Sequence, residues 1–289
     1  MLQSRLETVA KALPLAADYS QYDVEYVHAL RVATRRASAA MKLFEGGLPQ
    51  RRGAWFIRKL KRIRQIAGSA RDHDVLLLRL EKLAEQYPQA DWTPLLDHLL
   101  EQRAADQPAI EKIRRRLKSR WPVRLGKLLK KVHVPTEQPL PDRPTYGNAA
   151  GVLLSPAVRQ FCSHHPQPSD SDEMLHALRI DLKQLRYSME IFAGAFPTPF
   201  RQDIYPQVVF LQELLGELND SVVGRNQFES FLTTAQSPEL RDTLTQLMAH
   251  ETTRISTTRQ QFFTHWTPAQ QQSLQTAFCE FLPTNDCPQ

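Results

Sequence analysis

Two stretches of the sequence carry basic side chains at a spacing that suits anion binding. The first stretch is His28-Ala-Leu-Arg31-Val-Ala-Thr-Arg35-Arg36, and the second is His176-Ala-Leu-Arg179-Ile-Asp-Leu-Lys183. At 100° per residue, a helix gathers the basic residues of each stretch on one side. Arginine offers phosphate a planar fork of donors, and lysine offers a point charge. Such a line of cations predicts a surface that binds a phosphate-rich polyanion.

The elements that hold these residues must be amphipathic helices. In both stretches the apolar residues fall on the side opposite to the cations. Counted over each stretch and the residues that flank it, they are Tyr26, Leu30, Ala33, Ala37, Met41 and Phe44 for the first stretch, and Leu178, Leu182, Leu185, Met189 and Phe192 for the second. The pattern predicts helices over residues 23–45 and 171–195, each with one side in a core and cations on the other.

The two stretches belong to a longer internal repeat. His28 and His176 lie 176 − 28 = 148 positions apart. At the same offset Met41 matches Met189, Phe44 matches Phe192, Gly68 matches Gly216 and Asp72 matches Asp220. Because one offset holds over this whole span without a gap, it indicates a tandem duplication of one helical unit.

A second helix, expected over residues 51–67, carries further cations. Its basic side comprises Arg58, Lys61 and Arg62, with Arg64 toward the edge, and opposes Leu60, Ile63 and Ala67. Gly68 is expected to break or kink this helix. A third segment, 71–86, would then begin with Asp72 and Asp74 in its first turn, where carboxylates suit a helix N-terminus. Arg71 beside Asp72 fits either a ligand contact or an ion pair that fixes the kink.

Positive charge is concentrated in the first half of the chain. The net charge is +6, but residues 28–71 hold 12 Lys/Arg against one acid, which gives +11. Residues 103–131 hold 11 Lys/Arg against two acids, which gives +9, so the remaining residues sum to 6 − 11 − 9 = −14. Charge concentrated in this way attracts polyanions. The basic run from Arg114 to Arg124 fits either a solvated helix face or a secondary basic patch.

The motifs together resemble a known family. The stretch from His28 to Arg36, followed by Gly68-Ser-Ala-Arg71-Asp72-His-Asp74-Val, resembles the first half of a CHAD (conserved histidine α-helical) domain. The stretch from His176 to Tyr187, followed by Leu214-Leu-Gly-Glu-Leu-Asn-Asp220, resembles the second half. The resemblance implies an all-helical domain of two pseudo-symmetric helical bundles. It also implies binding of inorganic polyphosphate by basic side chains around a central groove or pore, with no established catalysis.

The repeat and the resemblance together predict a polyphosphate-binding site. We expect it to comprise His28, Arg31, Arg35, Arg36, Arg58, Lys61, Arg62, Arg64, Arg71, His176, Arg179, Lys183 and Arg186. A histidine beside an anion is readily protonated and would then donate to phosphate. The second repeat is less basic, because residues 176–220 hold four Lys/Arg against six acids. The positions that match Arg58, Lys61, Arg64 and Arg71 are Pro206, Val209, Gln212 and Asn219. Polyphosphate is therefore expected to bind mainly to the first repeat and to the motif helix of the second.

The whole chain is expected to be all-α. Helical patterns also cover residues 1–17, 93–131, 149–163, 201–215, 217–233, 238–264 and 268–282, and no alternating pattern is long enough for a strand. The proline-rich residues 134–148 predict a linker between a first repeat, 1–133, and a second repeat, 149–289. No cofactor and no metal is expected, because His164-His165 has no third ligand at a fitting spacing.

Two other functions stay open. A nucleic-acid-binding protein would share the electrostatics, but the basic sides are not interleaved with aromatic residues for base stacking, and no helix-turn-helix or finger pattern is present. A phosphate-processing enzyme would need an acidic metal site or an activated nucleophile beside the cations. The sequence therefore favours a non-catalytic module.

The expected setting of the protein is the cytoplasm. No apolar run approaches the length of a membrane span, and the N-terminus lacks the layout of a signal peptide. The three cysteines, Cys162, Cys279 and Cys287, are odd in number and have no motif spacing, which fits a reduced compartment. Binding of the polymer would allow association with polyphosphate granules.

Overall fold

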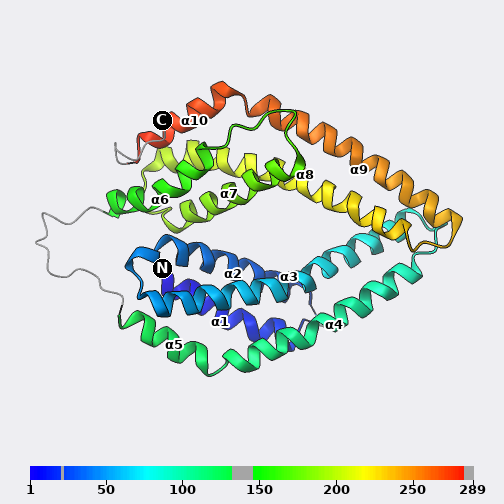
Figure 1. Cartoon of the computed structure of the whole chain (residues 1–289), viewed down its shortest axis with the longest axis horizontal. Coiled ribbons are helices and arrows are strands. Elements are labelled where there is room, and N and C mark those ends of the chain that lie inside the picture. Colours follow the sequence, from blue (N-terminus) through cyan, green and yellow to red (C-terminus); the bar gives the residue numbers. More distant parts are fainter. Residues whose placement is uncertain (21–22, 132–145, 283–289) are drawn as a thin grey trace, which may run out of the picture. The chain divides into compact units, whose positions relative to one another are not determined.

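The computed structural model describes residues 1–20, 23–131 and 146–282, and this part of the chain is helical without a β-strand (Figure 1). The first half holds α1 (Leu2–Asp18), α2 (Glu25–Leu43), the 3-10 turn η1 (Glu45–Gly47), α3 (Gln50–Gln86), α4 (Thr93–Leu117) and α5 (Arg120–Leu129). The second half holds α6 (Tyr146–Cys162), α7 (Asp172–Ile191), the π-helical turn η3 (Phe200–Ile204), α8 (Tyr205–Leu232), α9 (Pro238–His265) and α10 (Pro268–Cys279). The expected all-α class is confirmed.

The chain divides into two compact units, Met1–Thr136 and Glu137–Gln289. In both units a helix of moderate length is followed by a motif helix, two long helices and a short last helix. The pseudo-symmetry of two bundles and a groove or pore between them stay predictions. The expected linker, 134–148, lies outside the described residues except for its last three positions, which begin α6 instead.

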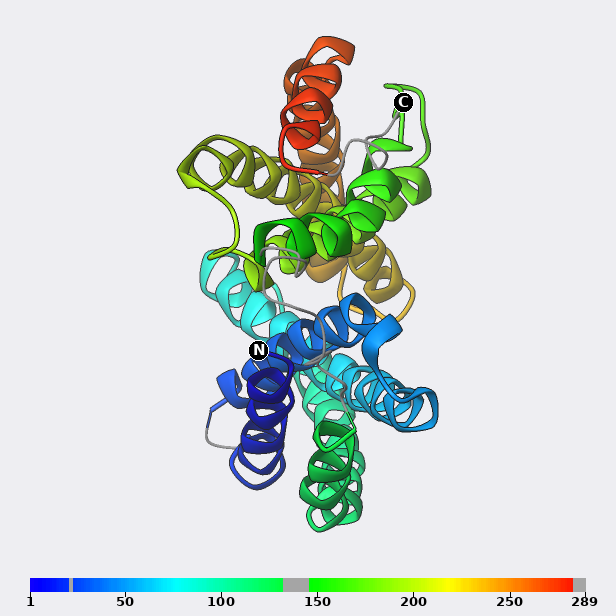
Figure 2. The same ribbon diagram turned by 90° about the vertical axis from the view of Figure 1, so that its left-hand side faces the viewer.

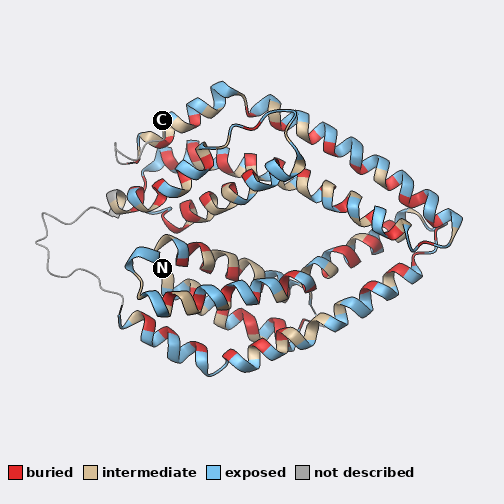
Figure 3. Cartoon of the chain, viewed as in Figure 1, coloured by how far each residue is buried: buried red, intermediate tan, exposed pale blue. Residues whose placement is uncertain are grey.

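The core of the first unit forms where the apolar sides of its helices meet. Leu30, Ala37 and Met41 of α2 are fully buried against Phe56 and Leu60 of α3 and the apolar side of α1. α1 also packs against α4 (Figure 1 and Figure 2). α5 closes this core with Trp121, whose indole N–H donates to the carbonyl of Leu6 at 3.2 Å. Figure 3 shows the buried positions along the sides of the helices that face their neighbours within the unit.

The second unit is built on the same principle. α7 packs between α6 and α8, and α8 makes its most extensive contact with α9. All five apolar residues that the pattern assigned to the buried side of the motif helix are buried here. Phe196 and Phe200 stack with ring centroids 4.0 Å apart, and Phe200 meets Phe278 of α10 edge to face.

The expected break at Gly68 is wrong, because α3 is a single helix of 37 residues that passes through it. Asp72 and Asp74 therefore lie in the middle of α3 and not in a first turn. A glycine costs a helix interior about 1 kcal/mol, yet α3 continues through Gly68, close to the buried residues Ala67 and Ala70. α8 likewise runs through Gly216, where two helices were expected, whereas the pattern over 93–131 resolves into the pair α4 and α5.

The cysteines differ from the expectation of three reduced thiols. Cys279 is disulfide-bonded, while Cys162 is a free thiol whose burial raises its pKa to about 11. A disulfide requires two cysteines whose Cα atoms lie about 4.4–6.8 Å apart, and spacing along a sequence does not reveal this distance. Cys287 lies outside the described residues. In the described part of the chain, no helix combines the length and the apolar character that spanning a membrane requires.

Candidate functional site

The motif helix α2 holds its cations close to the core. Leu30 and Ala37 are fully buried, and on the other side of the helix His28 is exposed while Arg31 and Arg35 are half-buried. Arg36 is also half-buried. Half-burial removes part of the water around a guanidinium but leaves its charge, so a nearby anion gains a stronger interaction than it would in open solvent.

Gly68 lies where the Arg31 side chain of α2 reaches the surface of α3. A Cβ added at this position would lie 2.9 Å from Nη1 of Arg31. The glycine thus leaves room for the Arg31 guanidinium against the surface of α3, and a side chain at this position would require the guanidinium to shift. The matching Gly216 has no described atom within 4 Å of such a Cβ.

The positive charges of three other arginines of α2 and α3 act on Arg31. Burial lowers the pKa of Arg31, Asp72 raises it, and the positive charges of Arg35, Arg71 and Arg64 lower it further. We call Arg31, Arg35, Arg64 and Arg71 the arginine cluster. The repulsion that Arg31 experiences from the other three is a cost to the unliganded protein that a nearby anion would reduce.

Only two carboxylates pair with the arginine cluster among the described residues. Asp72 Oδ1 lies 3.6 Å from Nη1 of Arg31, and Glu25 Oε1 lies 3.4 Å from Nη1 of Arg71. The sequence left open an ion pair between the neighbours Arg71 and Asp72. In the structure each of them pairs instead with a residue of α2, so that the two ion pairs connect α3 to α2. Both carboxylates are exposed, at 69% and 61%, so these pairs are weak and a ligand can displace them. Four cations against two anions leave an excess of two positive charges.

The outer side of α3 continues the positive surface. Arg58, Lys61 and Arg62 are exposed, and opposite them Leu60 and Ile63 are buried. Within the described ranges none of the three cations has a carboxylate at ion-pair distance. We call these three residues the α3 crest.

The second unit repeats part of this arrangement. Arg179 Nη2 lies 3.8 Å from Asp220 Oδ1, at the positions that match Arg31 and Asp72. His176, which is exposed, shares a hydrogen bond of 2.7 Å between its Nδ1 and Oδ1 of Asn219. His176 is thus oriented by the neutral side-chain amide of Asn219. The matching position in the first unit holds the cation Arg71.

The other two predicted residues of the second unit are less open to a ligand. Arg186 Nε donates to Oε1 of Glu190 at 3.1 Å, and Tyr205 Oη lies 3.4 Å from the same oxygen. Lys183 is half-buried on α7. Of the predicted residues of the first unit, the structure connects Arg31 with Arg35, Arg64 and Arg71 through their charges. Convergence of His28, Arg36, Arg58, Lys61 and Arg62 on the same ligand stays a prediction.

One group in the first unit brings together a serine, a histidine and an aspartate, yet its geometry is not that of an activated nucleophile. Ser69 Oγ donates to Oδ1 of Asp106 at 2.8 Å, and His73 Nδ1 lies 2.8 Å from the other carboxylate oxygen. Activation would need the hydroxyl to donate to the imidazole instead. Beside this group, Asp74 is buried and pairs with Nε of Arg103 at 2.5 Å, which joins α3 to α4. Burial raises the pKa of Asp74, and the bond to Arg103 counteracts this only in part.

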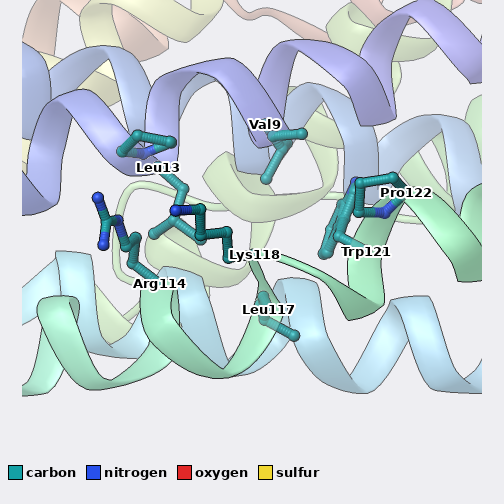
Figure 4. Close-up of a pocket in the computed structure, with 9 residues that line it drawn as sticks. Val9, Leu13, Arg114, Leu117, Lys118, Trp121 and Pro122 are labelled. Carbon is teal, nitrogen blue, oxygen red and sulfur yellow. The ribbon is translucent and has the colours of Figure 1, made fainter.

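An apolar cavity of about 220 Å³ lies between α1 and the α4–α5 junction (Figure 4). Val9, Leu13 and Trp121 point into it, and Arg114 lies at its edge. Nη2 of Arg114 is paired with Oδ2 of Asp18 at 2.7 Å. This lining does not suit a polyanion. Among the described residues, no group of three or more His, Cys, Asp and Glu could hold a metal ion.

Comparison with known proteins accords with the fold and the motifs. The chain superposes on the crystal structure of the CHAD domain from the plant Ricinus communis with a TM-score of 0.59 and 21% identity, covering 100% of this chain and 91% of that one. It also superposes on PptA from Streptomyces chartreusis with a TM-score of 0.58 and 18% identity, covering 92% of this chain and 96% of that one. At these identities the two structures show the fold alone. No curated protein matches the chain. The model of the CHAD domain family matches residues 1–229, and the chain therefore belongs to this family.

Proposed function

We propose that the first unit binds inorganic polyphosphate through the arginine cluster and the α3 crest, as a non-catalytic module. The observation that carries the proposal is the position of Arg31, which is half-buried over Gly68 and on which the positive charges of three further arginines act. The nearest opposing charges are two exposed carboxylates. The cations of the arginine cluster repel one another, so they are suited to bind a ligand with several closely spaced negative charges.

A linear phosphate polymer fits this surface better than a single phosphate would. The arginine cluster and the α3 crest together provide seven cations, spread over two helices instead of converging on one point. Lys61 and Arg64, or Arg58 and Arg62, are three or four residues apart and thus separated by about 4.5–6 Å along α3. A chain with a charge on every unit can meet several of them at once, and each contact releases counterions.

The second unit would contribute less to this binding. Arg179 and the exposed His176 are its best-placed donors, whereas Arg186 is held by Glu190. We infer that His28 and His176 donate to the polymer when it is bound. Location in the cytoplasm and association with polyphosphate granules are part of this proposal.

The first experiment is a titration of the purified full chain with long-chain polyphosphate at low and near-physiological salt. Single-stranded RNA and double-stranded DNA serve as competitors matched in phosphate concentration. Binding that persists at physiological salt and resists both nucleic acids supports the proposal. Equal binding to all three polymers, lost when salt is added, would show a generic basic surface, and preference for a nucleic acid would favour that alternative.

A charge-reversal variant tests where the polymer binds. Arg58→Glu/Lys61→Glu changes two exposed residues, so the fold should persist and the helical circular dichroism should be unchanged. We expect it to lose most of its affinity for polyphosphate. The matched control is Lys11→Glu/Lys82→Glu, which reverses two exposed cations of the same unit away from the cluster and the crest. Equal losses in both variants would contradict a localised site.

A further inference from the structure

A second group of cations surrounds Trp55 on the side of α3 that faces α5. Nζ of Lys59 lies 5.9 Å from the centre of the Trp55 ring, and Cζ of Arg124 lies 5.1 Å from it. The indole itself is fixed by edge contacts with Phe56, at 4.8 Å, and by Trp121, at 6.0 Å between ring centres. Two cations from different helices are therefore held by one anchored aromatic ring.

A cavity of about 470 Å³ opens beside this ring, where α4 ends and α5 begins. Its lining includes Trp55, Lys59, Arg115, Arg116 and Arg120. Arg115, Arg116, Arg120 and Arg124 are exposed, and within the described ranges neither they nor Lys59 have a carboxylate at ion-pair distance. We call Lys59, Arg115, Arg116, Arg120 and Arg124 the Trp55 patch.

The surrounding sequence supplies no negative charge to balance the patch. Between Lys112 and Lys131 the chain carries ten Lys/Arg and no Asp or Glu. An exposed helix face normally mixes charges of both signs. A cavity lined by one sign of charge concentrates the electrostatic potential and raises the local concentration of anions. This separates the Trp55 patch from an ordinary solvated helix face.

The patch is continuous with the surface assigned above. Going around α3 at 100° per residue, Lys59 is followed by Arg62, Arg58 and Lys61, and then by Arg64 of the arginine cluster. The buried Leu60 and Ile63 occupy the opposite side. The α3 crest thus joins the two groups of cations over the outside of one helix about 10–12 Å across.

We propose that the Trp55 patch is a second docking site for the same polyphosphate chain, which crosses the α3 crest from the arginine cluster. The inference rests on the function proposed above. A chain long enough to reach both sites binds the second one at a high effective concentration, so its affinity exceeds that of either site alone. A chain too short to cross the crest occupies the two sites independently.

The test compares tripolyphosphate with long-chain polyphosphate by isothermal titration calorimetry on the full chain. We expect two equivalents of tripolyphosphate per wild-type protein and one per Arg115→Gln/Arg116→Gln protein. The same variant should lose roughly 10²-fold in affinity for the long chain, because it loses the avidity of two linked sites. The control Lys11→Gln/Lys82→Gln removes the same charge elsewhere in the unit and should retain both properties.

The outcomes separate this inference from the function on which it rests. If the patch variant binds the long chain like the wild type, the second site is refuted while the proposed function stands. If Arg58→Gln/Lys61→Gln binds the long chain like the wild type and the patch variant does not, the assignment to the arginine cluster and the α3 crest is wrong, and the Trp55 patch is the binding site. If the wild type binds no long-chain polyphosphate, both proposals are overturned.

Discussion

The dependence of polyphosphate binding on salt should report how many cations touch the polymer. Each phosphate contact contributes roughly 0.7–0.9 to the slope of log K against log salt concentration, because one condensed counterion is released per contact. Arg58 and Lys61 are exposed and unpaired within the described ranges, so both are available to the ligand. Arg58→Gln/Lys61→Gln should therefore reduce the magnitude of the slope by roughly 1.4–1.8.

The affinity itself should fall by a smaller and separately measurable amount. Two exposed charge contacts are worth roughly 1–2 kcal/mol together, which corresponds to about a five- to thirty-fold increase in Kd. Fluorescence anisotropy of end-labelled polyphosphate at several salt concentrations measures the slope and Kd in one series. The unfolding midpoint in urea should not change, because neither side chain packs in the core.

The matched control for this series is Lys11→Gln/Lys82→Gln. Lys82 lies 21 residues beyond Lys61, about 30 Å further along α3, so it carries the same type of charge on the same helix outside the site. An unchanged slope in the Arg58 and Lys61 variant, or equal changes in both variants, would refute the reasoning that the α3 crest contacts the polymer directly.

Three further predictions follow from the environments of single residues. Gly68→Ala should displace the Arg31 guanidinium, which a Cβ would approach to 2.9 Å, and weaken polyphosphate binding. The matched Gly216→Ala, with no described atom within 4 Å, should leave binding unchanged and stabilise the protein by roughly 0.5–1 kcal/mol in urea unfolding; equal effects on binding would contradict the close approach. Burial raises the pKa of Asp74, so the folded state binds this proton more tightly than the unfolded state. The contribution of Asp74 to stability is therefore greatest below its unfolded pKa and falls as pH rises through its folded pKa. Asp74→Asn should flatten that part of the pH–stability curve, whereas Asp72→Asn, at an exposed position, should not; identical curves for the wild type and Asp74→Asn would disprove the shift. Cys162, with a pKa of about 11, should react with iodoacetamide at pH 8 roughly two hundred-fold more slowly than an unperturbed thiol, because far less of it is thiolate. Mass spectrometry of its peptide should show fast labelling only in denaturant, and fast labelling of the folded protein would contradict the shift.

The pattern of residue types determined much of the fold and of the candidate site. The helical period separates Leu30 and Ala37 from Arg31 and Arg35, and the structure buries the first pair and leaves the second at the surface. This succeeds because burial of apolar side chains dominates the packing of an amphipathic helix, whatever its partner. The internal repeat also carried over into the structure. One offset aligns Arg31 with Arg179 and Asp72 with Asp220, and each arginine forms an ion pair with the aspartate of its own unit.

The sequence could not decide contacts between residues that are far apart along the chain. Local propensity alone predicts a helix break at Gly68, but α3 is continuous in the folded protein. The guanidinium of Arg31 from α2 lies close to Gly68, where a Cβ would approach it to 2.9 Å. Asp74 was assigned to a helix start, yet its partner is Arg103 on α4. The patch around Trp55 brings Lys59 and Arg124 to one ring from positions 65 residues apart (124 − 59). Helical periodicity fixes which side of a helix is polar, whereas only the packing of one helix on another fixes which polar groups meet, because that depends on the register and angle between helices.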